Sequence, residues 1–558
     1  VRILNLSNDF NNLTITGTVS LASAIGTAGL LTVTGTLDTT ASNFGLTVGG
    51  GLTVNGATGI LRTNGSAVAE TGNVSINNAA GYITSAAGGS WSVTGSWTNS
   101  STSASWSFAA PVTFTSATNA TMTFGNLAQE FGGNVTFSSS SATPVTFTMS
   151  TNALRWGGTL SIADGVSTTE LATGGLGLAG GALSVGNGGI LTANASTVTV
   201  SSATMTGGTT GTLTVTTGAW TVAGSWNTSG AGSTWNAGTT SVYTFSATGT
   251  VTTLPAQSTF PALSVSGGTV TLGNNIAVTN ALTLSGGVLA KGANTLSAGS
   301  LTMSGGGLTS TSGNVTVNGN ANISSVSSYI AFGSEAWTIA GTGSNAATSA
   351  SWNPGTATIS FTSATGGTMT FAGANLPGNE FYNVTFGSSA ATPQTFTMAA
   401  RGLRVAATLT ITDGSSTTTL STSAGNLAIN AVTVNVNAGG VLTANGSVVT
   451  VTSIDTHLGT FTAGTSTVVI NASGGTVNVP QTLSSLTVGA AITTTFASSI
   501  TWTGTLTLTS STATFNSDLT SSGAATIVFT SATVSIAGSW NTSSATTFTA
   551  TGSTLSFP

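Results

Sequence analysis

The side chains that could take part in chemistry are few, and three of them recur about 250 residues later. An acid precedes phenylalanine at Glu130, at Glu380, which is 250 residues later, and at Asp9 near the start. Carboxylates could act as general acid and base on a glycosidic bond, or bind a cation. A simpler interpretation is that each acid occupies a corner and binds nearby backbone amides. We expect this structural role, with cation or partner binding as the alternative.

A second set of ionic residues has a similar spacing. Arg155 and Arg404 are 249 residues apart, and so are Asp164 and Asp413. Each aspartate precedes glycine, which is typical of a turn. Each arginine could pair with the aspartate of its own copy on a neighbouring coil. We expect such a pair to be a structural bridge rather than a site.

No residues form a recognisable catalytic, cofactor or metal motif. His457 is the one histidine and cysteine is absent, so neither a Ser-His-Asp triad nor a histidine or thiolate metal site can be assembled. The stretch Gly174-Gly-Leu-Gly lacks the helix and lysine of a phosphate-binding loop. The sequence therefore predicts no catalytic, cofactor-binding or metal-binding residues, and a protein that is not an enzyme.

Tryptophan and asparagine are the remaining candidates for binding. Many tryptophans stand beside Gly-Ser or Asn-Thr, namely Trp91, Trp97, Trp220, Trp226, Trp235, Trp337, Trp352 and Trp540. We expect them in the core, and a surface strip that stacks on sugars is the alternative. Asn-X-Ser/Thr sequons are candidate glycosylation sites, although most arise by chance in so Ser- and Thr-rich a chain; they include Asn12, Asn119, Asn134, Asn383 and Asn541.

Charge is almost missing from this chain. Six Lys or Arg and eleven Asp or Glu occur in 558 residues, so charged residues are 3% of the chain, where about a quarter is usual. Six cations cannot neutralise a phosphate backbone, which excludes nucleic acid as a partner. A surface of Ser, Thr, Asn and Gly suits a protein that is assembled, immobilised or glycosylated. No apolar stretch is long enough for a membrane-spanning helix.

Hydrophobic residues alternate with Thr or Ser over short segments. Examples are Leu13-Thr-Ile-Thr-Gly, Leu31-Thr-Val-Thr-Gly, Val145-Thr-Phe-Thr-Met and Leu506-Thr-Leu-Thr. This period of two, interrupted by Gly, Asn and Ser, is the pattern of short strands with one buried face. No segment has helical periodicity with caps, so we expect essentially no helix.

The chain contains a large internal duplication. Thr143-Pro-Val-Thr-Phe-Thr-Met recurs as Thr392-Pro-Gln-Thr-Phe-Thr-Met, 249 residues later, and Leu191-Thr-Ala-Asn recurs as Leu442-Thr-Ala-Asn, 251 residues later. The copies cover roughly residues 1–200 and 251–450, and residues 451–558 form a partial further copy that ends within a repeat.

Two all-β architectures suit this spacing of strands and turns. One is a right-handed parallel β-solenoid with very short strands, Gly or Asn turns and about 20 residues per coil. The other is a series of β-sandwich domains, which linkers rich in Pro or charge should separate. The nine Pro are scattered without a break in composition. We therefore predict one continuous solenoid over residues 1–558, with tandem sandwiches as the alternative.

The two ends of the sequence match parts of one internal repeat. Residues 536–543 match 222–229, and residues 1–17 match 251–267 at an offset of 250. This predicts head-to-tail stacking into a homopolymer. The expected interface residues are Val1, Leu4, Phe10, Leu13, Ile15, Trp540, Phe557 and Pro558. The alternative is a longer parent cut arbitrarily within a repeat.

In its Gly-, Ser- and Thr-rich texture, the whole chain resembles extracellular β-solenoid surface proteins of bacteria and archaea, such as filamentous-haemagglutinin adhesins and autotransporter passengers. The resemblance implies a secreted protein at the cell surface, although no secretion signal precedes Val1. We expect the structural subunit of an extracellular filament, sheath or surface layer. The alternatives are an adhesin that binds glycans or a host surface, and a polysaccharide-active β-helix enzyme.

Overall fold

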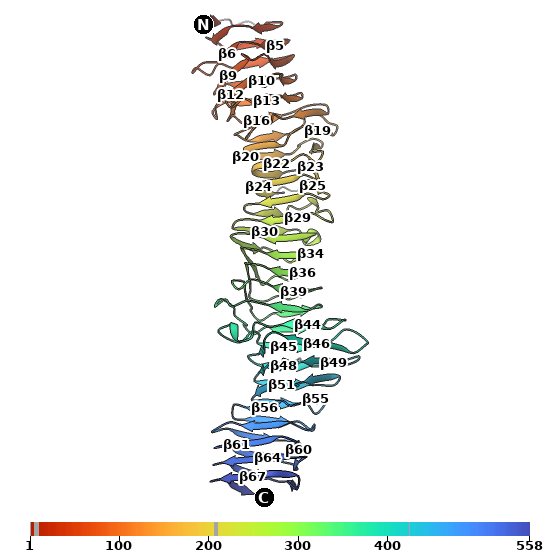
Figure 1. The fold of residues 1–558 in the computed structure, drawn as a ribbon. Helices are drawn as coiled ribbons and strands as arrows, with labels where there is room; N and C mark the ends of the chain where they lie inside the picture. The colour runs from red at the N-terminus through yellow and green to blue at the C-terminus, as the bar shows by residue number, and fades with distance from the viewer. Residues whose placement is uncertain (1, 5–9, 206–209, 423–424) are drawn as a thin grey trace. The chain divides into compact units, whose positions relative to one another are not determined.

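Short parallel strands, stacked coil upon coil, make up the protein. The computed structural model describes residues 2–4, 10–205, 210–422 and 425–558, and the chain divides into two compact units, Val1–Asn275 and Ile276–Pro558. In each unit the strands lie in successive layers (Figure 1). Parallel pairing between consecutive coils confirms the predicted β-solenoid. The alternative of tandem sandwiches is wrong, because those are built from antiparallel strands.

Three main columns of strands form unit 1, and each coil adds one strand to a column. The first column contains β1 (Arg2–Leu4), β3 (Thr18–Leu21), β6 (Thr36–Asp38), β9 (Ile60–Asn64), β12 (Tyr82–Ser85) and β15 (Ser107–Phe108). The second contains β2 (Leu13–Ile15), β5 (Leu30–Val33), β8 (Gly51–Val54), β11 (Val74–Ile76), β14 (Trp97–Asn99), β17 (Ala120–Thr123), β19 (Val145–Met149), β21 (Thr169–Ala172), β23 (Gly189–Asn194), β25 (Thr212–Val215) and β28 (Thr234–Asn236). The third contains β4 (Ile25–Thr27), β7 (Leu46–Val48), β10 (Ala67–Glu70), β13 (Ser90–Val93), β16 (Val112–Phe114), β18 (Val135–Phe137), β20 (Leu154–Ile162), β22 (Leu178–Val185), β24 (Thr197–Thr204), β26 (Ala219–Val222), β29 (Val242–Phe245) and β32 (Ala262–Val265). Beside β24 run β27 (Trp226–Thr228), β30 (Gly249–Thr253) and β33 (Thr269–Leu272), and β31 (Thr259–Phe260) precedes β32.

Unit 2 is built in the same way. Its longest column contains β34 (Ile276–Leu284), β36 (Leu296–Met303), β38 (Val315–Val317), β41 (Ala336–Ile339), β43 (Thr358–Phe361), β45 (Asn383–Phe386), β48 (Thr408–Ile411), β51 (Thr433–Val436), β54 (Ser453–Asp455), β57 (Gly475–Asn478), β59 (Thr493–Phe496), β62 (Thr512–Phe515), β65 (Thr533–Ile536) and β68 (Thr554–Ser556). A second column contains β39 (Ala321–Ile323), β42 (Gly343–Asn345), β44 (Gly367–Thr370), β46 (Gln394–Ala399), β49 (Thr418–Ser421), β52 (Gly440–Thr443) and β55 (Thr460–Thr462). A third contains β47 (Leu403–Arg404), β50 (Ile429–Asn430), β53 (Val448–Val451), β56 (Thr467–Ile470), β58 (Ser485–Val488), β61 (Thr505–Thr509), β64 (Ala525–Thr530) and β67 (Ala545–Thr551). Two short columns contain β35 (Val288–Gly292), β37 (Gly307–Ser310) and β40 (Tyr329–Ala331), and β60 (Ile500–Trp502), β63 (Leu519–Ser521) and β66 (Trp540–Asn541).

Strand register places like residues above one another. In unit 1 Leu13 pairs with Leu31, 18 residues later, and Ala120 pairs with Phe147, 27 residues later, so coil length varies between these values in this column. Alternate residues point inward, as the period of two predicts. In-register rings therefore stack: Phe114 lies 5.0 Å from Phe137 between ring centroids, with 18° between ring planes.

Asparagine and glycine form the corners between strands. Asn194 and Asn445, which end the repeated Leu-Thr-Ala-Asn motif, have φ of 42° and 51°. Asparagine tolerates this left-handed conformation better than most residues. In the described ranges the only helical segments are the 3-10 turns η1 (Pro255–Gln257) and η2 (Gly373–Asn375), which agrees with the expected lack of helix. Those residues contain no helix with the length and apolar character needed to cross a membrane.

Candidate functional site: two buried glutamates and their loops

Glu130 lies in the loop between β17 and β18, and its side chain is 1% exposed. Its carboxylate joins three segments of two coils. Oε1 accepts hydrogen bonds from Nε1 of Trp97 at 3.0 Å and from Nδ2 of Asn99 at 2.7 Å, both in β14. Oε2 accepts the backbone N–H of Gly125, where its own loop begins, at 3.0 Å. The acid thus cross-links its loop to the preceding coil.

Glu380 repeats this arrangement in unit 2, where it is 0% exposed. Its Oε1 accepts Nδ2 of Asn345 at 2.7 Å, and Oε2 accepts the backbone N–H groups of Ala372 and Gly373 at 3.0 and 3.3 Å. In both copies a tryptophan Nε1 also donates to the main-chain oxygen of the glutamate, from Trp106 and Trp352, at 2.8 Å. The duplication in sequence is therefore a duplication in local geometry.

Burial shifts the protonation of these acids. Desolvation raises the pKa of Glu130 from 4.5 to about 7, against the opposing effect of the hydrogen bonds from Asn99, Trp97 and Gly125. The pKa of Glu380 also rises to about 7, again because desolvation outweighs its hydrogen bonds and the charge of Arg401. Water exclusion, rather than another acid, sets both shifts.

Arg155 and Arg404 hold the same loops from the following coil. Nη1 of Arg155 donates to the Leu127 carbonyl at 2.7 Å, and Nη1 of Arg404 donates to the Leu376 carbonyl at 3.2 Å. The main-chain oxygen of each arginine accepts the N–H of its glutamate, at 3.0 Å in both copies. The expected Arg–Asp bridge is therefore wrong, because each guanidinium binds a loop carbonyl.

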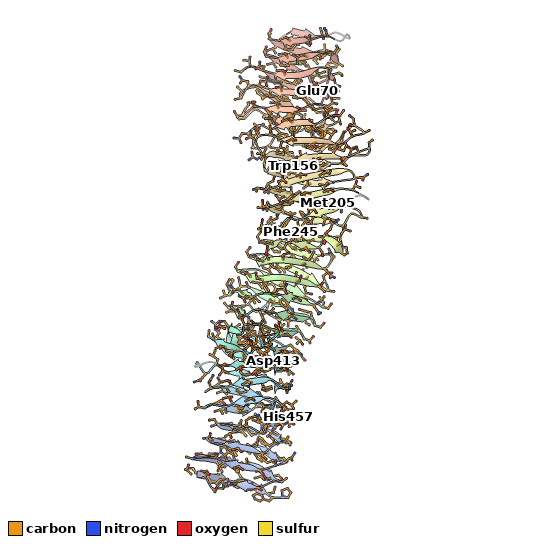
Figure 2. All side chains as sticks on the ribbon, turned by 90° about the vertical axis from the view of Figure 1, so that its right-hand side faces the viewer. Glu70, Trp156, Met205, Phe245, Asp413 and His457 are labelled. Atoms are coloured by element: carbon orange, nitrogen blue, oxygen red, sulfur yellow. The ribbon has the colours of Figure 1, made fainter. Side chains whose placement is uncertain are left out.

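The aspartates are turn residues, as predicted. Asp164 Oδ1 accepts the N–H groups of Val166 and Ser167, and its Oδ2 accepts the Thr169 hydroxyl at 2.9 Å. Asp413, labelled in Figure 2, makes the same set of bonds in unit 2. Hydrogen bonds lower the pKa of both aspartates, although desolvation acts in the opposite direction.

One difference between the copies leaves a hollow in unit 2. Trp97 pairs with Met122 in β17. In unit 2 the equivalent position is Gly343, because its neighbour Ser344 pairs with Thr370. Two residues further along, Asn345 binds Glu380 as Asn99 binds Glu130. A cavity of about 40 Å³ lies there, and its lining includes Phe361, Phe371 and Glu380. Glycine in place of tryptophan creates this space and removes one donor to the acid.

Most of the named tryptophans belong to the core, as expected. Seven of the eight are 7% exposed or less, namely Trp91, Trp97, Trp220, Trp226, Trp235, Trp337 and Trp352. Trp226 precedes Phe260 by 34 residues, as Trp97 precedes Phe131. Thr259 stands where Glu130 would be, and among the described residues the buried Nε1 of Trp226 has no hydrogen-bond acceptor. Glu130 supplies that acceptor for the equivalent indole of Trp97.

The sequon asparagines have a structural use. The Oδ1 atoms of Asn12, Asn119, Asn134 and Asn383 accept backbone N–H groups of the next coil, from Leu30, Thr146, Thr159 and Thr408, at 2.8 to 3.1 Å. Asn541 instead accepts the N–H and hydroxyl of Ser543 within its own turn. Except for half-buried Asn383, these five residues are exposed.

The residues expected at the subunit interface differ in exposure. Phe557 is 59% exposed, Pro558 is exposed and Trp540 is half-buried, whereas Ile15 is 4% exposed and Phe10 and Leu13 are half-buried. Leu4 belongs to β1, and Val1 lies outside the described residues. Two further apolar side chains of the last coil, Phe548 and Leu555, are 54% and 39% exposed, and sequence reasoning did not select them.

Sequence reasoning also missed several buried polar partners. Asn99 and Asn345 recur 246 residues apart, which is a signal that could have identified them. Glu70, labelled in Figure 2, is 1% exposed, and burial raises its pKa to about 7. The Lys291 ammonium is enclosed by the carbonyl oxygens of Gly292, Asn294, Ser312 and Gly313. These single occurrences carry no pattern that sequence alone could reveal.

His457 contacts an acid of its own turn. Its Nδ1 lies against Oδ1 of Asp455, two residues earlier, at an exposed turn, and hydrogen bonds and charge from His457 lower the pKa of Asp455 against desolvation. In the described part of the chain, no three His, Asp or Glu residues are grouped as metal ligands would be. Comparison with protein-family models, curated proteins and solved structures gave no match.

Proposed function

We propose that the protein is a structural subunit of an extracellular filament, sheath or surface layer, and that copies of the chain stack head to tail. The observation that carries this proposal is that the repeated ionisable groups bind the protein's own loops and coils. The carboxylates of Glu130 and Glu380 accept hydrogen bonds from their own loops and from the preceding coil. Asp164 and Asp413 bind their own turns, and Arg155 and Arg404 bind loop carbonyls. Such groups stabilise a scaffold. The uncharged Ser-, Thr- and Asn-rich surface suits immobilisation outside the cell.

An internal aromatic cluster supplies the template for the proposed contact. Tyr243 lies 5.4 Å from Trp226 and 5.3 Å from Phe260 of the next coil, between ring centroids. At the other end of the chain, Trp540 and Phe557 correspond to Trp226 and Tyr243, and their rings are 6.1 Å apart.

Phe10 corresponds to Phe260 at the offset of 250 residues. Phe10 of a second copy would therefore cover Phe557 as Phe260 covers Tyr243. Covering the exposed rings of Phe548 and Phe557 removes apolar surface from water, which favours association. The backbone edges of β67 and β68 would gain parallel partners at the same time.

Electron microscopy of the purified chain of residues 1–558 tests this proposal. The parent should form fibres of constant width. Phe557→Asp, or deletion of residues 1–15, should leave separate particles with unchanged β-sheet circular dichroism. Val166→Asp is the matched control, because Val166 is 74% exposed on a turn of unit 1 that belongs to neither the first nor the last coil, and it should still form fibres. Single closed particles from the parent, or normal fibres from Phe557→Asp, would overturn the proposal.

A further inference from the structure

A cleft of about 340 Å³ opens in unit 1 beside the Glu130 loop. One wall is the segment of residues 100–106 between β14 and β15, and the other is the segment of residues 124–134 between β17 and β18. Its lining includes Thr102, Ser103, Trp106, Ser107, Asn126 and Gln129. The volume lies within the range of about 300–1,000 Å³ that is usual for small-molecule sites.

The buried glutamate fixes both walls of this cleft. Glu130 binds Asn99 at the foot of the first wall, and Asn99 Oδ1 accepts the N–H of Ser101 at 2.8 Å. Ser101 and Ser103 hydroxyls then accept N–H groups two residues ahead, which holds the serine-rich segment in a series of turns. Glu130 also binds Gly125 at the start of the second wall, and Trp106 Nε1 ties the two walls together through the Glu130 carbonyl. The cleft is therefore preorganised.

The chemistry of the lining selects a neutral, hydroxyl-bearing ligand. No charged side chain lines the cleft. The exposed amides of Asn126 and Gln129 make no side-chain hydrogen bond in the described structure, and each offers both donors and an acceptor. Half-buried Trp106 adds an aromatic surface on which an apolar ring face can pack. Planar amides and hydroxyls around one tryptophan match the alternating polar edge and apolar face of a pyranose.

From this geometry we infer that the cleft beside Trp106 is a binding site for a neutral sugar unit of an oligosaccharide or polysaccharide. This activity goes beyond the proposed structural role. A filament subunit with such a site would attach to a glycan surface, and the site needs no assembly because unit 1 supplies every wall.

The corresponding loops of unit 2 lack the features that suit the cleft of unit 1 to a sugar. Trp352, the counterpart of Trp106, is only 7% exposed. Asn375, the counterpart of Asn126, has its side-chain amide against the Arg401 guanidinium, with the closest contact at 2.8 Å. Asn152 replaces that arginine in unit 1 and binds the Phe124 carbonyl instead. Unit 1 therefore carries the sugar site, and the corresponding loops of unit 2 do not.

Isothermal titration of the full chain with cellotriose, maltotriose, xylotriose and trigalacturonate tests the site. At least one neutral trisaccharide should bind, and trigalacturonate should not. Trp106→Ala should weaken binding by at least about tenfold, and Asn126→Ala or Gln129→Ala by about fivefold each. Because Trp106 also packs on Phe108, the two amide variants keep the test decisive if Trp106→Ala does not fold.

Two further variants use the difference between the copies. Asn152→Arg places a guanidinium beside Asn126, as Arg401 stands beside Asn375, and should abolish binding. Asn375→Ala in unit 2 is the matched control and should leave binding unchanged. Failure of every neutral trisaccharide to bind, binding of trigalacturonate alone, or full affinity in both Asn126→Ala and Gln129→Ala would overturn the inference. Because fibre formation is measured separately, none of these binding results decides the proposed structural function.

Discussion

The buried acid Glu130 makes the stability of its coils depend on pH. Its pKa is about 7 in the folded protein and 4.5 in the exposed state, because burial disfavours the charged form. Below pH 4.5 both states are protonated and the full stability is present. Between pH 4.5 and 7 the unfolded carboxyl ionises while the folded one does not, so stability falls as pH rises. This difference in pKa corresponds to about 3 kcal/mol.

Hydrogen exchange followed by mass spectrometry measures this locally. After correction for the intrinsic exchange rate at each pH, peptides covering residues 97–99 and 125–131 should lose protection by about 300-fold from pH 4.5 to 7.5. Glu130→Gln resembles the protonated acid and should remove this loss. Glu170→Gln should keep it, because Glu170 binds the hydroxyls of Thr146 and Thr192 elsewhere in the unit. Constant protection in the parent, or the same loss in Glu130→Gln, would refute the reasoning.

Two other substitutions follow from the packing. Trp97→Gly, which copies Gly343, should destabilise the coils around β14 by about 3–5 kcal/mol through a large cavity and a lost hydrogen bond to Glu130. Gly343→Ala should change stability by about 1 kcal/mol or less, because its Cβ would meet the ring of Phe361 at 3.1 Å and the methyl of Met369 at 3.2 Å. Protection of the β14 and β42 peptides from hydrogen exchange compares the two variants, and equal effects would contradict the equivalence of Trp97 and Gly343. Lys291→Met should lower the thermal midpoint of unit 2, at a cost of about 2–4 kcal/mol, because it removes the donor shared by four carbonyls. An unchanged circular-dichroism melting curve would show that these four hydrogen bonds are dispensable.

The regular part of the fold could be predicted from the sequence because each strand carries its own signal. Leu13-Thr-Ile alternates burial as its residues alternate polarity, and the Asn of Leu191-Thr-Ala-Asn forms the expected left-handed corner. The corner role of Glu130 and Glu380 followed from their repetition beside phenylalanine. Parallel stacking was inferred from tight glycine turns and was confirmed by the strand register.

The details of the site could not be predicted, because they depend on contacts between coils. The Arg155 guanidinium could reach either Asp164 or the loop carbonyl of Leu127, and only the folded register decides between them. Asn99 meets Glu130 across 31 residues, and no local pattern relates the two. The cleft beside Trp106 likewise requires two loops of different coils, each of which reads alone as an ordinary polar turn.

Pairing between consecutive coils has a mechanical consequence. Inside each unit a strand is bonded to the coil before it and the coil after it, so tension along the stacking direction is carried by these rows in series. Failure under load would then release one coil at a time. In the second column of unit 1 a coil contains 18 to 27 residues, and each rupture would lengthen the chain by about 60–95 Å at full extension. A tether built in this way yields gradually and keeps its remaining coils folded.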